Sequence, residues 1–290
     1  CSWGYQASGY FCPTSRYGTA KELMEMVDLF HKEGIGVIMD FVPVHFIADT
    51  YALNKFDGTA LYEYADADKG YSEWGTCNFN YYRGEVRSFL QSSANFWMEK
   101  YHADGIRMDA ISNAIYWQGD SSKGINEGAL DFIKCMNSGL QKLHPSVMLI
   151  AEDSTNFPKV TAPVEYDGLG FDYKWSGGWT KDLLEYLSKD PIERKNYHDQ
   201  LTMSMLYAYC EHYILTLGSR DVGTLKDFAD KLPGSEEQKN AQIREAYAYM
   251  MLHPGCKMMA PDKDMPKELE VFVKDLNNMY LAHPALYQLD

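Results

Sequence analysis

The sequence predicts an α/β barrel, in which parallel strands alternate with helices and functional residues gather at one end of the strands. Two observations indicate this class. Segments with helical spacing and short apolar, β-branched segments follow one another along the 290 residues, and acidic residues stand at the ends of three of the strands. No Gly-rich GxGxxG turn opens a helix, which argues against the alternative, a doubly wound sheet that binds a dinucleotide.

The first helix and strand follow each other directly. Residues 19–22 (Thr-Ala-Lys-Glu) read as a capping box, apolar residues with helical spacing come next, and Gly34 ends the helix. Residues 35–39 are short, apolar and β-branched, so we expect a strand that ends on Asp40.

The same pair recurs along the chain. An apolar stripe over residues 86–101 is ended by Gly105 and followed by a strand, residues 106–110, that carries Asp109. A third helix and a third strand lead to Glu152. Further strands are expected at 168–175, 213–217 and 257–260, and further helices at 181–187, 238–252 and 265–276. No short repeat or low-complexity linker interrupts the pattern, so we expect one domain over residues 1–290.

Composition excludes several functions. A formal charge of -14 and a pI of about 5.0 would repel nucleic acid and anionic membrane surfaces. No apolar run approaches the roughly 18 residues of a membrane span, and no signal-peptide pattern opens the chain, so we expect a soluble, cytoplasmic protein. The six cysteines form no CxxC pair, which predicts reduced, mostly buried thiols instead of a disulfide framework or a zinc site.

Two charged residues on the second strand point to chemistry. Arg107 and Asp109 are two apart on a strand, so both side chains face the same side, and the arginine would keep the carboxylate ionised, as a nucleophile requires. An isolated Arg-x-Asp is more often a structural ion pair. Glu152 changes that balance, because paired carboxyls about 5 Å apart are the arrangement of a retaining glycosidase.

Asp40 and His45 flank the end of the first strand, and Pro43 between them would turn His45 back over the barrel. A lone histidine in a loop is more often structural than a substrate ligand. Residues 74–82 are rich in aromatics but also in Gly and Asn, which makes them a poor core strand. These rings either pack under a long loop or form a platform for sugar faces, and composition favours neither.

Three strings carry a resemblance to a known family. DFVPVH at 40–45, GIRMDA at 105–110 and AEDS at 151–154 look like three signature regions of the α-amylase superfamily, in the right order. Residues 3–18 and 167–175 resemble the glycogen branching enzymes in particular. The likeness runs from about residue 2 to residue 217 and returns near the end of the chain.

The resemblance implies a role for each of these residues by position. Asp109 would be the nucleophile, Glu152 the acid/base, and Arg107 the residue that orients Asp109. Tyr5, Asp40 and His45 would line the subsite that holds the sugar under attack. The reaction implied cleaves an α-1,4 bond and transfers the chain to a C6 hydroxyl of an α-glucan such as glycogen or amylose, with no metal or organic cofactor.

The chain also departs from the family pattern. Where the family has Ser-His-Asp, this chain has Ser219, Arg220 and Asp221. Asp221 is then the candidate for the third catalytic acid, although a one-residue shift would put Arg220 in that place. A long Gly-rich stretch expected after Ala260 is missing, as are the first strand, the N-terminal carbohydrate-binding module and the C-terminal β-sandwich.

We therefore expect an incomplete (β/α)8 barrel of the TIM type, a truncated catalytic domain. Because it begins at Cys1 and not at Met, we expect natural sequence before it. Three functions remain open: a branching enzyme, a hydrolytic relative of the amylase type, and a degenerate barrel that only binds glucan. The sequence predicts neither the length of the transferred chain nor the oligomeric state.

Overall fold

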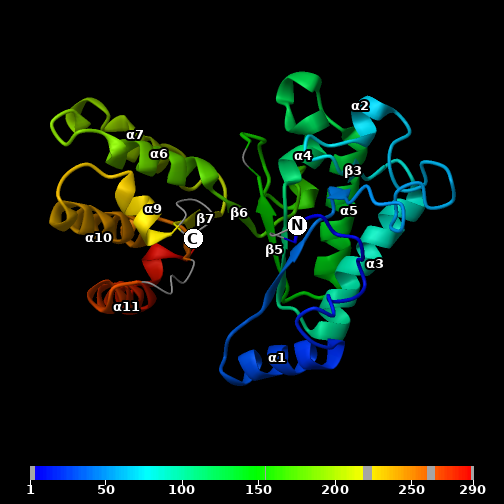
Figure 1. Ribbon diagram of the computed structural model, residues 1–290, viewed down its shortest axis with the longest axis horizontal. Coiled ribbons are helices and arrows are strands. Elements are labelled where there is room, and N and C mark those ends of the chain that lie inside the picture. The colour runs from blue at the N-terminus through cyan, green and yellow to red at the C-terminus, as the bar shows by residue number, and fades with distance from the viewer. Residues whose placement is uncertain (1–3, 154, 218–223, 260–264, 289–290) are drawn as a thin grey trace. The chain divides into compact units, whose positions relative to one another are not determined.

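The computed structural model describes residues 4–153, 155–217, 224–259 and 265–288. The chain folds as two compact units, Cys1–Asp172 and Tyr173–Asp290. In Figure 1 the first unit runs from blue to green and the second from green to red.

The first unit is built from three pairs of a helix and a strand. Their bounds are Ala20–Lys32 (α1) with Ile38–Phe41 (β1), Gly84–Tyr101 (α3) with Gly105–Met108 (β4), and Glu127–Leu143 (α5) with Met148–Glu152 (β5). β4 lies between β1 and β5 and pairs with both in parallel. The C-terminal ends of the three strands therefore lie at one edge of this layer, which we call the C-terminal edge.

Local chemistry explains where these elements begin and end. The predicted capping box forms at α1: the Thr19 hydroxyl accepts from the Glu22 N–H at 3.2 Å, and the Glu22 carboxylate accepts from the Thr19 N–H at 2.7 Å. α3 ends at Tyr101, and the capping residue His102 that follows adopts a left-handed conformation with φ of 54°. Gly105 opens β4, where a Cβ atom would lie only 2.7 Å from the carbonyl oxygen of Met148.

The long connection from β1 to α3 contains little regular structure. A small antiparallel pair joins His45–Phe46 (β2) to Cys77–Asn78 (β3), and a one-turn helix spans Ala67–Gly70 (α2). After β4 the chain turns at once into the short helix Ile111–Ile115 (α4). Short 3-10 helices lie at Trp117–Gly119, Ser121–Lys123 and Val164–Tyr166.

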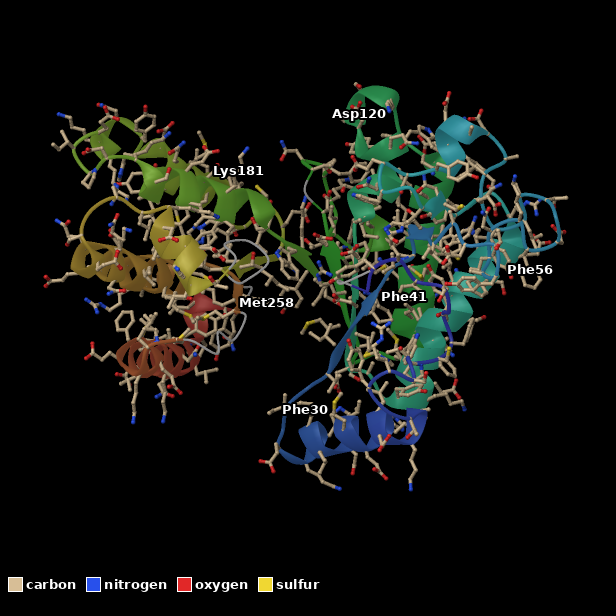
Figure 2. The ribbon with its side chains drawn as sticks, viewed as in Figure 1. Phe30, Phe41, Phe56, Asp120, Lys181 and Met258 are labelled. Carbon is tan, nitrogen blue, oxygen red and sulfur yellow. The ribbon has the colours of Figure 1, made fainter. Side chains whose placement is uncertain are left out.

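The core of the first unit is strongly aromatic. Phe79 is fully buried, and Tyr81 stacks on Phe132 with ring centroids 5.1 Å apart. Trp74 and Tyr82 of the same segment stay 43% and 64% exposed. The aromatic segment is thus divided between rings that pack in the core and rings that face solvent. Figure 2 shows Phe41 inside this unit and Phe56, 66% exposed, at its periphery.

The second unit contains three parallel strands. Its strands are Tyr173–Trp175 (β6), Tyr213–Thr216 (β7) and Cys256–Met258 (β8), with β7 in the middle. Its helices are Gly177–Ser188 (α6), Asp199–Tyr207 (α7), Leu225–Asp230 (α9), Glu236–Leu252 (α10) and Lys267–Ala282 (α11), with 3-10 turns at Arg194–Asn196 and Pro284–Leu286. Trp179 of α6 stacks on Tyr249 of α10, with ring centroids 6.0 Å apart.

The predicted alternation of helices with parallel strands is confirmed in both units, but several details were wrong. β1 begins at Ile38 and includes Asp40, whereas β6 is shorter than the strand expected at 168–175. Gly105 belongs to β4, and α3 ends before it.

Cys77 is buried, but the exposed cysteines contradict the expectation of mostly buried thiols: they are Cys12, Cys135 and Cys210. Among the described residues, no helix combines the length and the apolarity of a membrane span.

Candidate active site

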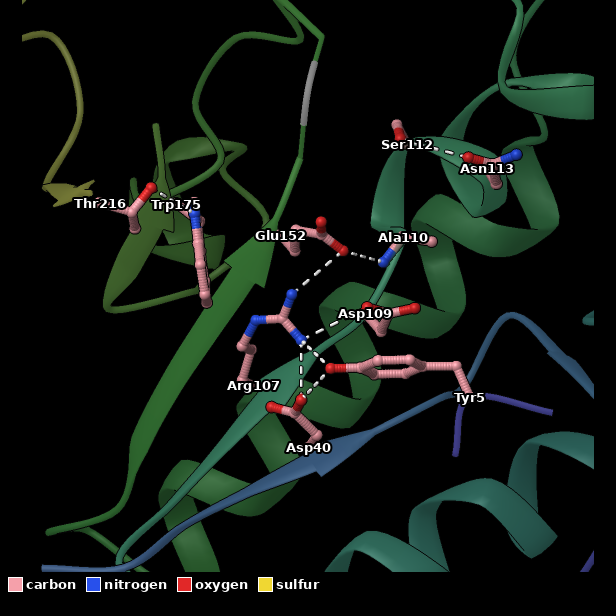
Figure 3. Close-up of polar contacts among 10 residues, drawn as sticks. All are labelled: Tyr5, Asp40, Arg107, Asp109, Ala110, Ser112, Asn113, Glu152, Trp175 and Thr216. Atoms are coloured by element: carbon pink, nitrogen blue, oxygen red, sulfur yellow. Dashed lines mark hydrogen bonds and ion pairs between the residues drawn. The ribbon is translucent and has the colours of Figure 1, made fainter. Parts of the chain in front are cut away.

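Arg107 lies at the centre of a cluster of polar side chains on the C-terminal edge (Figure 3). Its Nη1 donates to Asp40 Oδ2 at 3.0 Å and to Asp109 Oδ1 at 3.3 Å, and its Nη2 lies 3.4 Å from Glu152 Oε2. The arginine side chain is only 3% exposed. One guanidinium therefore joins carboxylates from the ends of three neighbouring strands. We call these four side chains and that of Tyr5 the Arg107 cluster.

The strand register produces this arrangement. Asp40 on β1 is the Cα partner of Arg107 on β4, so the two side chains start from adjacent positions. Asp109 follows β4, and its N–H donates to the carbonyl of Phe41 at 2.9 Å, which carries the pairing one step past the strand. Glu152 is the last residue of β5, the other neighbour of β4. Because the three strands are parallel and adjacent, their C-terminal ends, and with them these side chains, lie at one edge.

Tyr5 completes the cluster from the N-terminal loop. Its hydroxyl donates to Asp40 Oδ2 and accepts from Arg107 Nη1 at 3.3 Å. Burial, the hydrogen bond to Asp40 and the charge of Asp40 together raise the pKa of Tyr5 to about 12. The phenol therefore keeps its proton at neutral pH and acts as a donor within the cluster.

The electrostatics keep Arg107 charged in spite of its burial. Burial alone lowers the pKa of an arginine, but the charges of Asp40 and Glu152 more than offset that effect, and the pKa is raised above its ordinary value. The guanidinium is thus a permanent cation that fixes the surrounding carboxylates by directed hydrogen bonds.

Ala110 belongs to the site through its backbone, which the sequence did not reveal. Its φ of 53° and ψ of 39° are left-handed, a conformation that residues other than glycine rarely adopt. In this conformation the Ala110 N–H donates to Glu152 Oε2 at 2.9 Å. Nothing in an alanine side chain signals this role, because the signal is a backbone angle.

His45 is buried against Trp74. It sits on β2, 3% exposed, with its ring centroid 5.0 Å from that of Trp74. Burial lowers the pKa of His45 to about 4, so the ring is neutral at pH 7. Among the described residues, Nδ1 of His45 has no hydrogen-bond partner, and the ring makes no hydrogen bond to the Arg107 cluster.

Two further expectations concern a third acid and a metal. Asp221 lies outside the described residues, together with Ser219 and Arg220, so its place in the site stays a prediction. Within the described stretches, no group of three or more His, Cys, Asp or Glu side chains is placed to hold a metal ion.

The cluster has the parts for nucleophilic and acid/base chemistry. Asp109 is 7% exposed and Glu152 24% exposed at their side chains, and both contact the same guanidinium. A carboxylate held in this way can attack an electrophilic carbon, while the other carboxyl moves a proton to and from the leaving or entering oxygen.

Curated bacterial proteins are similar to this chain along its whole length. The chain is 42% identical to the 1,4-alpha-glucan branching enzyme of Fusobacterium nucleatum, over 99% of the chain and 50% of that protein. It is 42% identical to the enzyme of that name from Geobacillus stearothermophilus, over 100% of the chain and 49% of that protein. It is 41% identical to the enzyme of that name from Bacillus subtilis, over 100% of the chain and 50% of that protein. The chain spans about half the length of these curated relatives.

Solved structures share the fold of this chain. An α-amylase from Geobacillus thermoleovorans, complexed with acarbose, matches with a TM-score of 0.71 and 17% identity, over 98% of this chain and 66% of that one. A cyclomaltodextrinase matches with a TM-score of 0.69 and 17% identity, over 97% of this chain and 51% of that one. At such identities the likeness shows the fold alone. No family model matches the chain.

Proposed function

Because the chain belongs to the family of 1,4-alpha-glucan branching enzymes in the α-amylase superfamily, we propose that it cleaves α-1,4 glucan and rejoins the chain as α-1,6 branches. The observation that carries the proposal is the Arg107 cluster, in which one buried cation holds Asp109 and Glu152 at adjacent strand ends. The substrate would be an α-glucan such as amylose or glycogen, and the pathway glycogen biosynthesis in the cytoplasm.

The proposed reaction is a double displacement. Asp109 attacks the anomeric carbon, the α-1,4 bond breaks, and the leaving oxygen takes a proton from Glu152, which leaves a covalent glucosyl ester. Glu152 then removes the proton from a C6 hydroxyl, whose oxygen attacks the same anomeric carbon and releases Asp109. The anomeric configuration is inverted twice and thereby retained.

The contacts of Glu152 indicate which of its oxygens would move the proton. Oε2 accepts a hydrogen bond from the Ala110 N–H at 2.9 Å and forms an ion pair with Arg107, whose Nη2 lies 3.4 Å away. An oxygen that accepts a hydrogen bond and lies beside a cation is poorly suited to carry a proton of its own. In this mechanism Oε1 is therefore the atom that delivers and later receives the proton.

Other members of the cluster would bind the sugar that is under attack. Asp40 is 44% exposed at its side chain, so it can accept hydrogen bonds from sugar hydroxyls while Arg107 and Tyr5 hold it. His45 would contribute from β2, and Asp221 would supply the third acid. We further propose that both units belong to one catalytic domain, an incomplete (β/α)8 barrel over residues 1–290.

Incubation with amylose tests the proposal. The ratio of α-1,6 to α-1,4 linkages, measured by proton NMR, should rise with the parent chain and stay constant with Asp109→Asn or Glu152→Gln. New reducing ends without new branch points would show the hydrolytic alternative. Glucan binding without any bond cleavage would show a degenerate barrel, the alternative that the Arg220 departure from the family pattern favours.

A further inference from the structure

Trp74 stands at the tip of a tightly bonded turn, residues 72–76. The Ser72 N–H donates to the Thr76 carbonyl at 2.8 Å, and the Gly75 N–H donates to the Ser72 carbonyl at 3.1 Å. The Ser72 and Thr76 hydroxyls are hydrogen-bonded at 2.5 Å, and the Ser72 hydroxyl also accepts from the Trp74 N–H at 3.2 Å. Gly75 has a φ of 71°, which suits glycine. The backbone under the indole is therefore fixed before any ligand arrives.

Two contacts tie this turn to the elements that leave the C-terminal edge. The Trp74 ring lies 5.0 Å from the ring of His45, inclined by 47°, and His45 follows β1 by only a few residues. The Asn113 side chain donates to Glu73 Oε1 at 3.5 Å, and Asn113 belongs to α4, which follows Asp109 directly. The turn thus belongs to the same end of the strands as the Arg107 cluster.

The exposure of Trp74 is not explained by packing. Phe79 and Tyr81, a few residues later, are 0% and 2% exposed, whereas Trp74 keeps 43% of its surface in solvent. An indole buries more apolar area than most side chains, so leaving it half exposed on a fixed turn forgoes stabilisation. His45 behind it is 97% buried and has, among the described residues, no partner for Nδ1, so the histidine does not explain the position of the ring by a hydrogen bond.

We infer that Trp74 is a stacking platform for a glucosyl unit of the α-glucan chain, in a subsite beyond the sugar that Asp109 attacks. The inference rests on the proposed function and names a substrate contact for it. The face of a glucopyranose presents C–H groups that pack on an aromatic ring, and an indole offers the largest such face. Because the turn is pre-ordered, the stacking would require little loss of conformational freedom.

Binding to a catalytically silent chain tests the platform directly. In an Asp109→Asn background, which prevents turnover, calorimetry with maltoheptaose gives the dissociation constant. Trp74→Ala should raise that Kd about tenfold, the loss expected for one aromatic contact. Trp74→Phe should raise it less, because a smaller ring remains. Tyr209→Ala is the control: Tyr209 is 75% exposed but precedes β7, away from the C-terminal end of that strand, and the Kd should not change.

A second readout separates a ligand contact from a structural role. If Trp74 only supports His45, Trp74→Ala should lower the melting temperature and kcat while the Kd for maltoheptaose stays at the parent value, and the inference is then wrong. If it is a platform, maltoheptaose should change the tryptophan fluorescence of the parent, and that change should be lost in Trp74→Phe. A fluorescence change of equal size in Trp74→Phe would also overturn the inference.

The outcomes distinguish this inference from the proposed function. A chain that makes no α-1,6 linkages but binds maltoheptaose in a Trp74-dependent way would refute branching and keep the platform. A chain that branches amylose with the same KM in Trp74→Ala and in the parent would keep branching and refute the platform. An Asp109→Asn chain that does not bind maltoheptaose at all would refute the platform as well.

Discussion

Replacement of Arg107 by methionine should destabilise the protein by about 3 kcal/mol at pH 7, because it leaves buried carboxylates without their cation. The magnitude follows from the exposure of each partner. Asp109 is 7% exposed and Glu152 24%, so their charges are poorly solvated once the arginine is gone. Asp40 is 44% exposed and is screened by water, so its share is small. We therefore place the loss at the lower end of the range for broken buried ion pairs.

Arg107→Lys separates charge from geometry. A lysine restores the positive charge, so the free energy of unfolding should fall between those of the parent and of Arg107→Met. A single ammonium cannot hold Asp109 through one nitrogen and Glu152 through another, as the guanidinium does. The branching rate should therefore fall at least about tenfold in both variants, since two carboxyls that are misplaced relative to each other react slowly.

Urea unfolding at pH 7, followed by circular dichroism, measures the stability, and α-1,6 linkage formation measures the rate. Arg87→Met is the matched control, because Arg87 pairs with Asp131 at 2.6 Å but the two side chains are 27% and 69% exposed. That exposed pair should contribute less than about 1 kcal/mol. Our reasoning is refuted if Arg107→Met unfolds like the parent, or if Arg107→Lys branches amylose at the parental rate.

Three further predictions follow from single residues. Ala110→Gly should raise the free energy of unfolding by up to about 1 kcal/mol in urea, because glycine adopts the left-handed conformation without strain, and a destabilised variant would contradict this. Gly105→Ala should lower it by about 1–3 kcal/mol, because the new Cβ would lie 2.7 Å from the Met148 carbonyl oxygen, and an unchanged urea midpoint would show that β5 can move aside. The pKa of His45 is lowered by burial from 6.5 to about 4, so as the pH falls from 7 to 5 the unfolded chain takes up a proton that the folded chain does not. This should remove about 2 kcal/mol of stability at pH 5, and His45→Gln should lose that much less than the parent between the two pH values.

Helical and strand periodicity predicted the elements that carry the site, because burial of one face is a local property of the sequence. The stripe ending at Tyr101 became α3, and the acids at the ends of the predicted strands lie on one edge because parallel strands share a direction. The exposure of Cys135 could also have been predicted from the sequence. It lies between Ile133 and Met136 on α5 but off their apolar stripe, so helical spacing places it outside.

Other features depend on tertiary structure and left no local signal. Tyr5 lies in a loop ahead of α1, whose path no periodicity fixes, so only the family resemblance placed it near Asp40. The conformation of Ala110 follows from the turn between β4 and α4. The division of the aromatic segment, with Trp74 outside and Phe79 inside, follows from how the loop packs on the core.

The net charge of the Arg107 cluster indicates which transition state it can stabilise. Three carboxylates around one guanidinium leave two net negative charges when all are ionised, and one when Glu152 carries a proton. In the proposed mechanism Glu152 gains a negative charge as it gives its proton to the leaving oxygen, while Asp109 loses one as it bonds to the anomeric carbon, so the cluster stays net negative while positive charge develops at that carbon. A cluster of this charge would stabilise such a transition state more than the neutral sugar, which is the condition for catalysis. The same charge would oppose the anionic transition state of phosphoryl transfer, so the electrostatics of these side chains favour glycosidic chemistry independently of any sequence comparison.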